Sequence, residues 1–215
     1  MKLFYAPGAC SLADRIALHE GGFTADFERV DLTSKLTEHG SDFMAVNPKG
    51  YVPVLVLDNG ETVTENIAVL SWIASQAPAL APTGALAQTR LIEALAFIST
   101  EVHKSFKPLF THGASSADRA SAADAIHNRL QLIADTLIGP YLFGTRFTVA
   151  DAYLFVNLRW AKKFGVLVPP VLVEYFHRVG ARDAVRNALI EEGLDQDPPI
   201  PNRIVPSRPE IDPSP

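Results

Sequence analysis

The sequence predicts a small α/β domain with a four-stranded mixed sheet, followed by an all-helical domain. Within residues 1–78, short strand-like segments alternate with helix-like ones. Residues 77–84 are rich in Pro, Ala and Gly, which is the composition of a linker. From residue 85 to 194, apolar residues recur at helical spacing without a strand pattern. The total of 215 residues suits two domains.

The first domain has the predicted order β-α-β-α-β-β-α. Local signals mark its elements: the Pro7-Gly8 turn ends the first strand, Ser11 caps the first helix, and Asp58-Asn59-Gly60 closes a hairpin. The predicted strands are 2–5, 27–32, 51–57 and 61–64, and the predicted helical segments are 11–21, 41–46 and 65–76. Two crossovers require parallel pairing and the hairpin an antiparallel edge. This is a thioredoxin-like arrangement.

The second domain shows helical periodicity only. Thr148 and Asp151 form a start that is similar to a capping box. The predicted helices are 86–106, 118–137, 148–164, 171–180 and 183–192. The proline-rich tail, 195–215, has little to bury, and we expect it to be disordered.

Composition excludes several classes of function. The net charge of −5 has no basic stripe, so nucleic acid is not an expected partner. No apolar stretch is long enough to span a membrane, and the N-terminus does not resemble a signal peptide. One cysteine allows no internal disulfide, which fits a cytoplasmic protein. The histidines show no metal-ligand spacing, and no loop matches a nucleotide-binding motif. We therefore expect neither a metal nor a nucleotide cofactor.

Cys10 lies between the first strand and the first helix. A helix N-terminus stabilises an anion, so the position favours a thiol of lowered pKa that acts as a nucleophile. The alternative is a buried, inert cysteine. Residue 13 is alanine, so Cys10 has no nearby partner, and any redox reaction passes through a mixed disulfide with another thiol. Glutathione is the natural candidate.

Three further motifs have both a structural and a functional interpretation. Pro53 within a strand is either an ordinary edge proline or a cis proline that turns the Val52 backbone toward a peptide ligand. Glu65 and Asn66 begin a helix, where they either cap it or bind a ligand with an amine and a carboxylate. His103 follows Ser99 and Thr100 by about one turn and is either a packing residue or part of a site.

Together these segments resemble bacterial beta-class glutathione S-transferases. The resemblance covers residues 1 to about 194, and its most specific pieces are 2–12, 46–53, Thr64-Glu65, 100–104 and 147–155. It implies that glutathione is a co-substrate and that the protein is a homodimer. Asn66, where Ser or Gly is common, and Ala96, where some relatives carry asparagine, depart from the family pattern.

The resemblance also implies residue roles. Cys10, Ser11 and His103 would act near the sulfur. Glutathione would contact the residues Cys10, Lys35, Val52, Pro53, Glu65, Asn66, Thr100 and His103, and the acceptor would contact Tyr5 and Trp160. The expected activity is transfer of glutathione to small, largely apolar electrophiles, with Cys10-dependent thiol–disulfide exchange as a second activity. The alternative is a non-catalytic ligand-binding or regulatory protein on the same fold.

Overall fold

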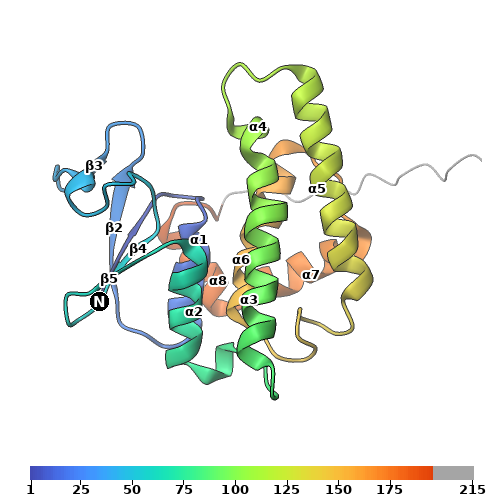
Figure 1. Cartoon of the computed structure of the whole chain (residues 1–215), viewed down its shortest axis with the longest axis horizontal. Helices are drawn as coiled ribbons and strands as arrows, with labels where there is room; N and C mark the ends of the chain where they lie inside the picture. The colour runs from blue at the N-terminus through green and yellow to red at the C-terminus, as the bar shows by residue number, and fades with distance from the viewer. Residues whose placement is uncertain (196–215) are drawn as a thin grey trace, which may run out of the picture.

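The computed structural model describes residues 1–195. The predicted disordered tail therefore lies outside the described residues, apart from Asp195. A small sheet packs beside a larger group of helices (Figure 1). This confirms the predicted fold class, a thioredoxin-like part followed by a helical part.

The sheet has five strands in the order β3-β2-β1-β4-β5. The strands are β1 (Lys2–Tyr5), β2 (Asp26–Asp31), β3 (Leu36–Thr37), β4 (Val54–Val56) and β5 (Thr62–Thr64). All four predicted strands are present, and β3 is an additional two-residue edge strand within a predicted loop. Its short ladder pairs Val30 with Thr37 and Asp31 with Leu36.

One expectation about strand direction was wrong. Only β1 and β2 are parallel, whereas β4 runs antiparallel to β1 and to β5. The segment between β2 and β4 contains β3 and a short 3₁₀ turn, Phe43–Ala45, instead of a crossover helix. The chain therefore passes to the other side of β1 and enters β4 in the opposite direction.

The two faces of the sheet are covered differently. Helices α1 (Ser11–Glu20) and α2 (Asn66–Gln76) cover the face that carries Leu3. The other face buries Phe4 against Phe43 of the 3₁₀ turn, with their ring centroids 5.7 Å apart. The larger core continues from α1 and α2 into the helical part without a break.

The helical part has the predicted order, with one helix interrupted. Helix α3 (Ala87–Phe97) passes into a π-helical turn, Ile98–His103, then a 3₁₀ turn, Lys104–Phe106, and α4 (Lys107–Phe110). The sequence predicted a single helix over 86–106. The helices that follow are α5 (Ser116–Thr136), α6 (Val149–Phe164), α7 (Pro170–Gly180) and α8 (Asp183–Glu191).

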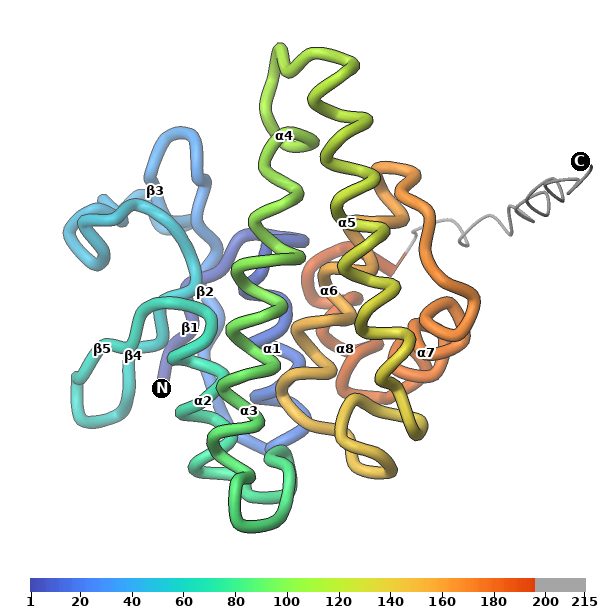
Figure 2. The backbone as a smooth tube through the Cα atoms, turned by 45° about the vertical axis from the view of Figure 1, so that its right-hand side comes forward, coloured from blue at the N-terminus to red at the C-terminus, as the bar shows by residue number. Residues whose placement is uncertain are grey.

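Helix α6 is the central helix, packed against α1 and α3 (Figures 1 and 2). Its start is a buried capping box in which the Asp151 carboxylate accepts hydrogen bonds from the Thr148 N–H at 2.7 Å and hydroxyl at 2.9 Å. The same carboxylate accepts from Leu142 N and Tyr175 OH, both at 2.8 Å. Gly165 ends the helix in the left-handed conformation, φ 68°. These contacts fix α6, which carries part of the site.

Candidate active site

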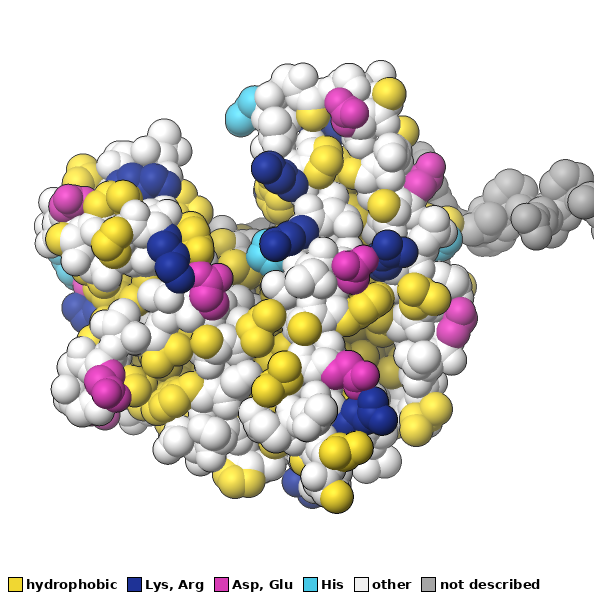
Figure 3. All heavy atoms as spheres, in the orientation of Figure 1, with side chains coloured by type: hydrophobic (Ala, Val, Ile, Leu, Met, Phe, Trp, Pro, Cys, Tyr) yellow, Lys and Arg dark blue, Asp and Glu magenta, His cyan; other side chains and the backbone are white. Residues whose placement is uncertain are grey.

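A cleft of about 670 Å³ lies between the sheet side and the helical side of the molecule. The space-filling view shows the surface hollowed there (Figure 3). One side, the thioredoxin-like wall, consists of residues 6–10, 51–53 and 65–67 together with Leu32. The other side, the helical wall, consists of Ser99, His103, Lys104, Phe110, Tyr153, Trp160 and Lys163.

Cys10 lies in the thioredoxin-like wall directly before the first residue of α1. Its thiol donates to the carbonyl oxygen of Val52 at 3.7 Å, and the Val52–Pro53 peptide bond is cis. The structure therefore brings the predicted reactive cysteine next to Val52 and Pro53, which the sequence singled out as a candidate peptide-binding edge.

The ionisation of Cys10 differs from the expectation. Burial, with a smaller contribution from Asp14, raises the pKa of the Cys10 thiol to about 12. The backbone N–H groups of the helix N-terminus act in the opposite direction but are outweighed. The prediction of a lowered pKa for the Cys10 thiol was wrong, because burying the thiolate costs more free energy than the helix N-terminus contributes to stabilising it. At neutral pH Cys10 is a thiol and a hydrogen-bond donor.

Asn66 connects the beginnings of α1 and α2. Its amide nitrogen, oriented toward the acceptors around it, donates to the Cys10 carbonyl at 3.2 Å and to Asp14 Oδ2 at 2.8 Å. Burial raises the pKa of Asp14 well above its usual value. The amide of Asn66 thus holds the Cys10 backbone in place, although the residue also lines the cleft.

Glu65 forms a polar cluster at the mouth of the cleft. Its Oε1 accepts from Lys49 Nζ at 2.5 Å and from the Tyr51 hydroxyl at 2.7 Å. These two hydrogen bonds lower the pKa of Glu65, so the carboxylate is ionised. Glu65 has a positive φ of 73°, which is rare outside glycine and places it at a sharp turn before α2.

On the helical wall, His103 is held by two aromatic residues of α6. Its Nδ1 lies 2.6 Å from the Tyr153 hydroxyl, and its ring meets Trp160 edge-on at 4.7 Å between centroids. Burial lowers the pKa of His103 to about 4 and raises that of Tyr153. Both are therefore neutral at pH 7. A neutral imidazole that accepts from the Tyr153 hydroxyl at Nδ1 carries its proton on Nε2.

Known proteins are similar to this chain in both sequence and structure. Residues 9–76 match the family model described as glutathione S-transferase, N-terminal domain. The chain is 40% identical to glutathione S-transferase GstA of Escherichia coli O157:H7 over 200 residues, which are 90% of this chain and 100% of that protein. The chain belongs to the glutathione S-transferase family.

Solved structures of glutathione S-transferases are also similar to this chain. The bacterial beta-class glutathione S-transferase of Sphingomonas chungbukensis is 47% identical with a TM-score of 0.83, and a sphingomonad glutathione S-transferase complexed with glutathione is 45% identical with a TM-score of 0.84. Each comparison covers 90% of this chain and 100% of the other. The resemblance of this chain to bacterial beta-class glutathione S-transferases, which the sequence motifs indicated, is confirmed.

Four residues that the family resemblance placed in the site lie outside the cleft lining. Ser11 is fully buried, and its hydroxyl exchanges hydrogen bonds with the backbone of Ala6. Tyr5 is buried beneath Arg15, whose guanidinium lies 4.1 Å from the ring centroid. Neither side chain is available to a ligand in the cleft, because neighbouring segments of the fold already cover it.

The other two, the half-buried Lys35 and the exposed Thr100, have local partners. Lys35 donates to the Gly50 carbonyl at 2.7 Å, beside the Tyr51 segment but outside the cleft lining. Thr100 is exposed and donates to the Ala96 carbonyl at 3.0 Å. Ser99 lines the cleft instead, because the π-helical turn shifts the angular positions of residues 98–103.

Two residues at this cleft were not predicted from the sequence: Tyr153, which lines the helical wall, and Lys49, which bonds to the cleft-lining Glu65. A signal for Tyr153 existed, since it lies seven residues before Trp160 and so on the same helical face. For Lys49 none existed, because its pairing with Glu65 depends on the fold of the loop.

The loop before Cys10 is anchored by the helical part. The N–H of Gly8 donates to Glu192 Oε2 at 2.8 Å, and the Gly8 carbonyl accepts from the Trp160 indole, also at 2.8 Å. Arg15 pairs with Glu192 at 3.3 Å. Burial raises the pKa of Glu192 to about 7 despite these partners. The position of the Cys10 loop therefore depends on residues near the end of the described chain.

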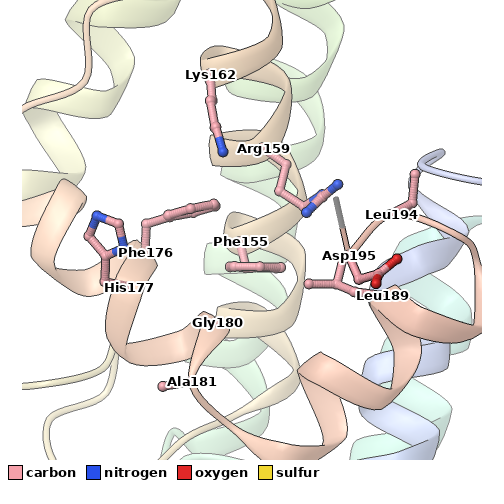
Figure 4. A pocket seen from close by; sticks show the side chains of 10 residues that line it. All are labelled: Phe155, Arg159, Lys162, Phe176, His177, Gly180, Ala181, Leu189, Leu194 and Asp195. Atoms are coloured by element: carbon pink, nitrogen blue, oxygen red, sulfur yellow. The ribbon is translucent and has the colours of Figure 1, made fainter. Parts of the chain in front are cut away.

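A second hollow lies among α6, α7 and α8, away from the cysteine (Figure 4). Phe155, Arg159, Lys162, Phe176 and His177 are among its lining residues. Within residues 1–195, no group of three His, Cys, Asp or Glu side chains is placed to hold a metal ion. No helix in the same range is long and apolar enough to cross a membrane.

Proposed function

We propose that this protein transfers the glutathione sulfur to an electrophilic carbon of small, largely apolar molecules. The observation that carries the proposal is that the Cys10 thiol and the neutral His103 imidazole line the same cleft from opposite walls. Each can donate a hydrogen bond at neutral pH, and neither carries a charge. Donors of this kind stabilise a thiolate placed between them.

The tripeptide would lie along the thioredoxin-like wall. The backbone of Val52 would pair with the cysteinyl residue, next to the cis Pro53. The exposed Glu65 carboxylate would accept from the γ-glutamyl ammonium group, and Asn66 would act by holding Cys10. Lys35 would reach the glycyl carboxylate by leaving its contact with Gly50.

The reaction requires an ionised glutathione sulfur at neutral pH. Lowering the thiol pKa by about two units needs about 2.7 kcal/mol of preferential stabilisation of the thiolate. Two hydrogen bonds to a charged acceptor, each contributing about 1.5–3 kcal/mol, are sufficient. The thiol proton passes to water, the thiolate forms a carbon–sulfur bond, and with a chloroarene the chloride leaves with the electron pair of the broken bond.

The test is conjugation of 1-chloro-2,4-dinitrobenzene, combined with an ultraviolet pH titration of bound glutathione. We expect turnover and ionisation of the bound thiol well below pH ~8.5, the value for a free thiol. A folded protein that binds glutathione, leaves its thiol protonated at pH ~8 and conjugates no electrophile would instead be the non-catalytic ligand-binding protein.

A second candidate activity is thiol–disulfide exchange through Cys10. It is favoured by the position of the single cysteine beside the Val52 carbonyl, where a mixed disulfide with glutathione would lie. In this reaction the Cys10 thiolate attacks a glutathione disulfide, and one glutathione leaves as a thiolate. Since burial raises the pKa of Cys10, we expect an adduct that forms slowly at pH 7 and faster as the pH rises.

A homodimer and a small electrophilic co-substrate are further parts of the proposal, and they rest on the family resemblance. Light scattering of the purified protein would give the oligomeric state. A mass of one chain, independent of concentration, would overturn the dimer.

A further inference from the structure

The outer part of the cleft exposes several large apolar side chains. Leu32, Tyr51 and Phe110 are large hydrophobic residues that are 37%, 43% and 46% exposed, and all three line the cleft. Phe110 meets Trp160 edge-on, with ring centroids 5.3 Å apart, and meets Phe164 in the same way at 4.8 Å. We call the two cleft-lining rings, Phe110 and Trp160, the aromatic shelf; Phe164 packs against Phe110 but is not among the residues that line the cleft. A flat apolar molecule can pack against it.

A lysine lies at the edge of this shelf. Lys163 Nζ is 5.8 Å from the centroid of Phe110 and 5.7 Å from that of Phe164, and the residue is exposed and lines the cleft. Its neighbour Lys162 lines the second hollow instead, among α6, α7 and α8 (Figure 4). Consecutive lysines of α6 therefore serve different surfaces.

The charges of the cleft separate into two halves. Glu65 is the one acidic side chain among the described residues that line it, and Lys49 and Tyr51 already bond to it. Lys104 also acts electrostatically on Glu65 and so belongs to the half where glutathione would lie. Lys163 lies instead over the rings of Phe110 and Phe164. The acceptor half is therefore apolar with a positive charge at its edge.

We propose that Lys163 selects acceptors in which an anionic group, such as a carboxylate, is attached to an aromatic electrophile. The aromatic body would pack on the aromatic shelf, and the anion would pair with Lys163 Nζ. Lys163 is thus a specificity-determining residue of the transfer reaction, and the inference rests on the proposed function. In the reaction the anion stays intact: the carbon–sulfur bond forms at the carbon bearing chloride, and chloride leaves.

The experiment compares 4-chloro-3,5-dinitrobenzoate with the neutral 4-chloro-3,5-dinitrobenzamide. For each variant, kcat/KM is divided by the uncatalysed rate constant of the same compound. The ratio of the two normalised values, anion over amide, measures the preference for negative charge. The variants are Lys163→Gln, Lys163→Arg, which keeps the cation, and Lys162→Gln as the control from the same helix.

We expect Lys163→Gln to lower this ratio about fivefold, mainly through KM, as the loss of a solvent-exposed ion pair implies. Lys163→Arg should keep the ratio within about twofold, and Lys162→Gln should leave it unchanged. Added salt should weaken the preference in the wild-type protein. An unchanged ratio in folded Lys163→Gln, with both compounds still turned over, would overturn the inference. Turnover of neither compound by the wild-type protein would overturn the proposed function itself.

Discussion

The thioredoxin-like wall combines backbone groups with the polar side chains of Cys10 and Glu65, whereas the helical wall presents mainly aromatic and basic side chains. On the first wall, the Val52 carbonyl meets Cys10, and the amide of Asn66 is used to hold the backbone. On the second wall, His103, Trp160 and Lys163 project into the cleft. Under the proposed function, the first wall would hold the constant tripeptide, and Lys163 on the second wall would select the acceptor. His103 on the second wall would still serve the glutathione sulfur.

The two walls are nevertheless not independent. The N–H of Gly8 donates to Glu192, and the carbonyl of Gly8 accepts from the Trp160 indole. A change in the helical part can therefore displace Cys10, which lies two residues further along. The following predictions test how far the comparison holds.

The largest effect is expected where the helical wall loses its support. Asp151→Ala removes the carboxylate that accepts from Leu142, Thr148 and Tyr175, and it leaves these donors buried without a partner. We expect the free energy of unfolding to fall by about 3 kcal/mol. Urea denaturation measures it. Asp118→Ala, in the exposed cap of α5, is the control and should cost under about 1 kcal/mol.

The link between the walls predicts a pH dependence. The pKa of Glu192 is about 7 in the folded protein against 4.5 ordinarily, so the folded state binds more protons between these values. Stability should therefore fall as the pH rises from about 4.5 to 7, by up to about 3 kcal/mol. Glu192→Gln should flatten this part of the profile, measured by urea denaturation at several pH values. A Glu192→Gln profile as steep as that of Glu191→Gln would contradict the assignment.

Within the helical wall, Tyr153→Phe tests the orientation of His103. The change removes the hydroxyl that lies 2.6 Å from Nδ1 and leaves the ring in place. We expect kcat/KM for conjugation to fall about tenfold, since about 1.4 kcal/mol of transition-state stabilisation is lost. Tyr141→Phe, whose hydroxyl instead accepts from Arg182, is the matched control. Equal losses in both variants would indicate general destabilisation.

A comparable effect is expected on the thioredoxin-like wall. Because Cys10 is a neutral donor, Cys10→Ala should lower kcat/KM for conjugation about tenfold, as for the loss of one hydrogen bond to a charged acceptor at the low end of its range. The same variant should form no adduct with oxidised glutathione, as judged by mass spectrometry, since the chain has no other cysteine. A loss of conjugation beyond about a hundredfold would instead make Cys10 the reacting group.

Much of the fold was predictable because its signals are local. Turn residues such as Pro7-Gly8 and Asn59-Gly60 mark where strands end, and helical periodicity identifies α6 without reference to its neighbours. The association of Cys10, Val52 and His103 came from the family resemblance, and the structure places them around one cleft. The direction of β4 was missed, because it depends on which side of β1 the chain passes.

The sequence by itself determined the order of the elements and the side chains available to the cleft. The tertiary structure decided how those side chains behave. A helix N-terminus favours an ionised cysteine, yet the pKa of Cys10 is about 12 because distant segments bury it. Ser99 replaces Thr100 in the cleft because a π-helical turn rotates this part of the helix, and Ser11 lies beneath the loop to which it bonds. Desolvation and side-chain direction depend on everything packed around a residue, and only the folded chain specifies that environment.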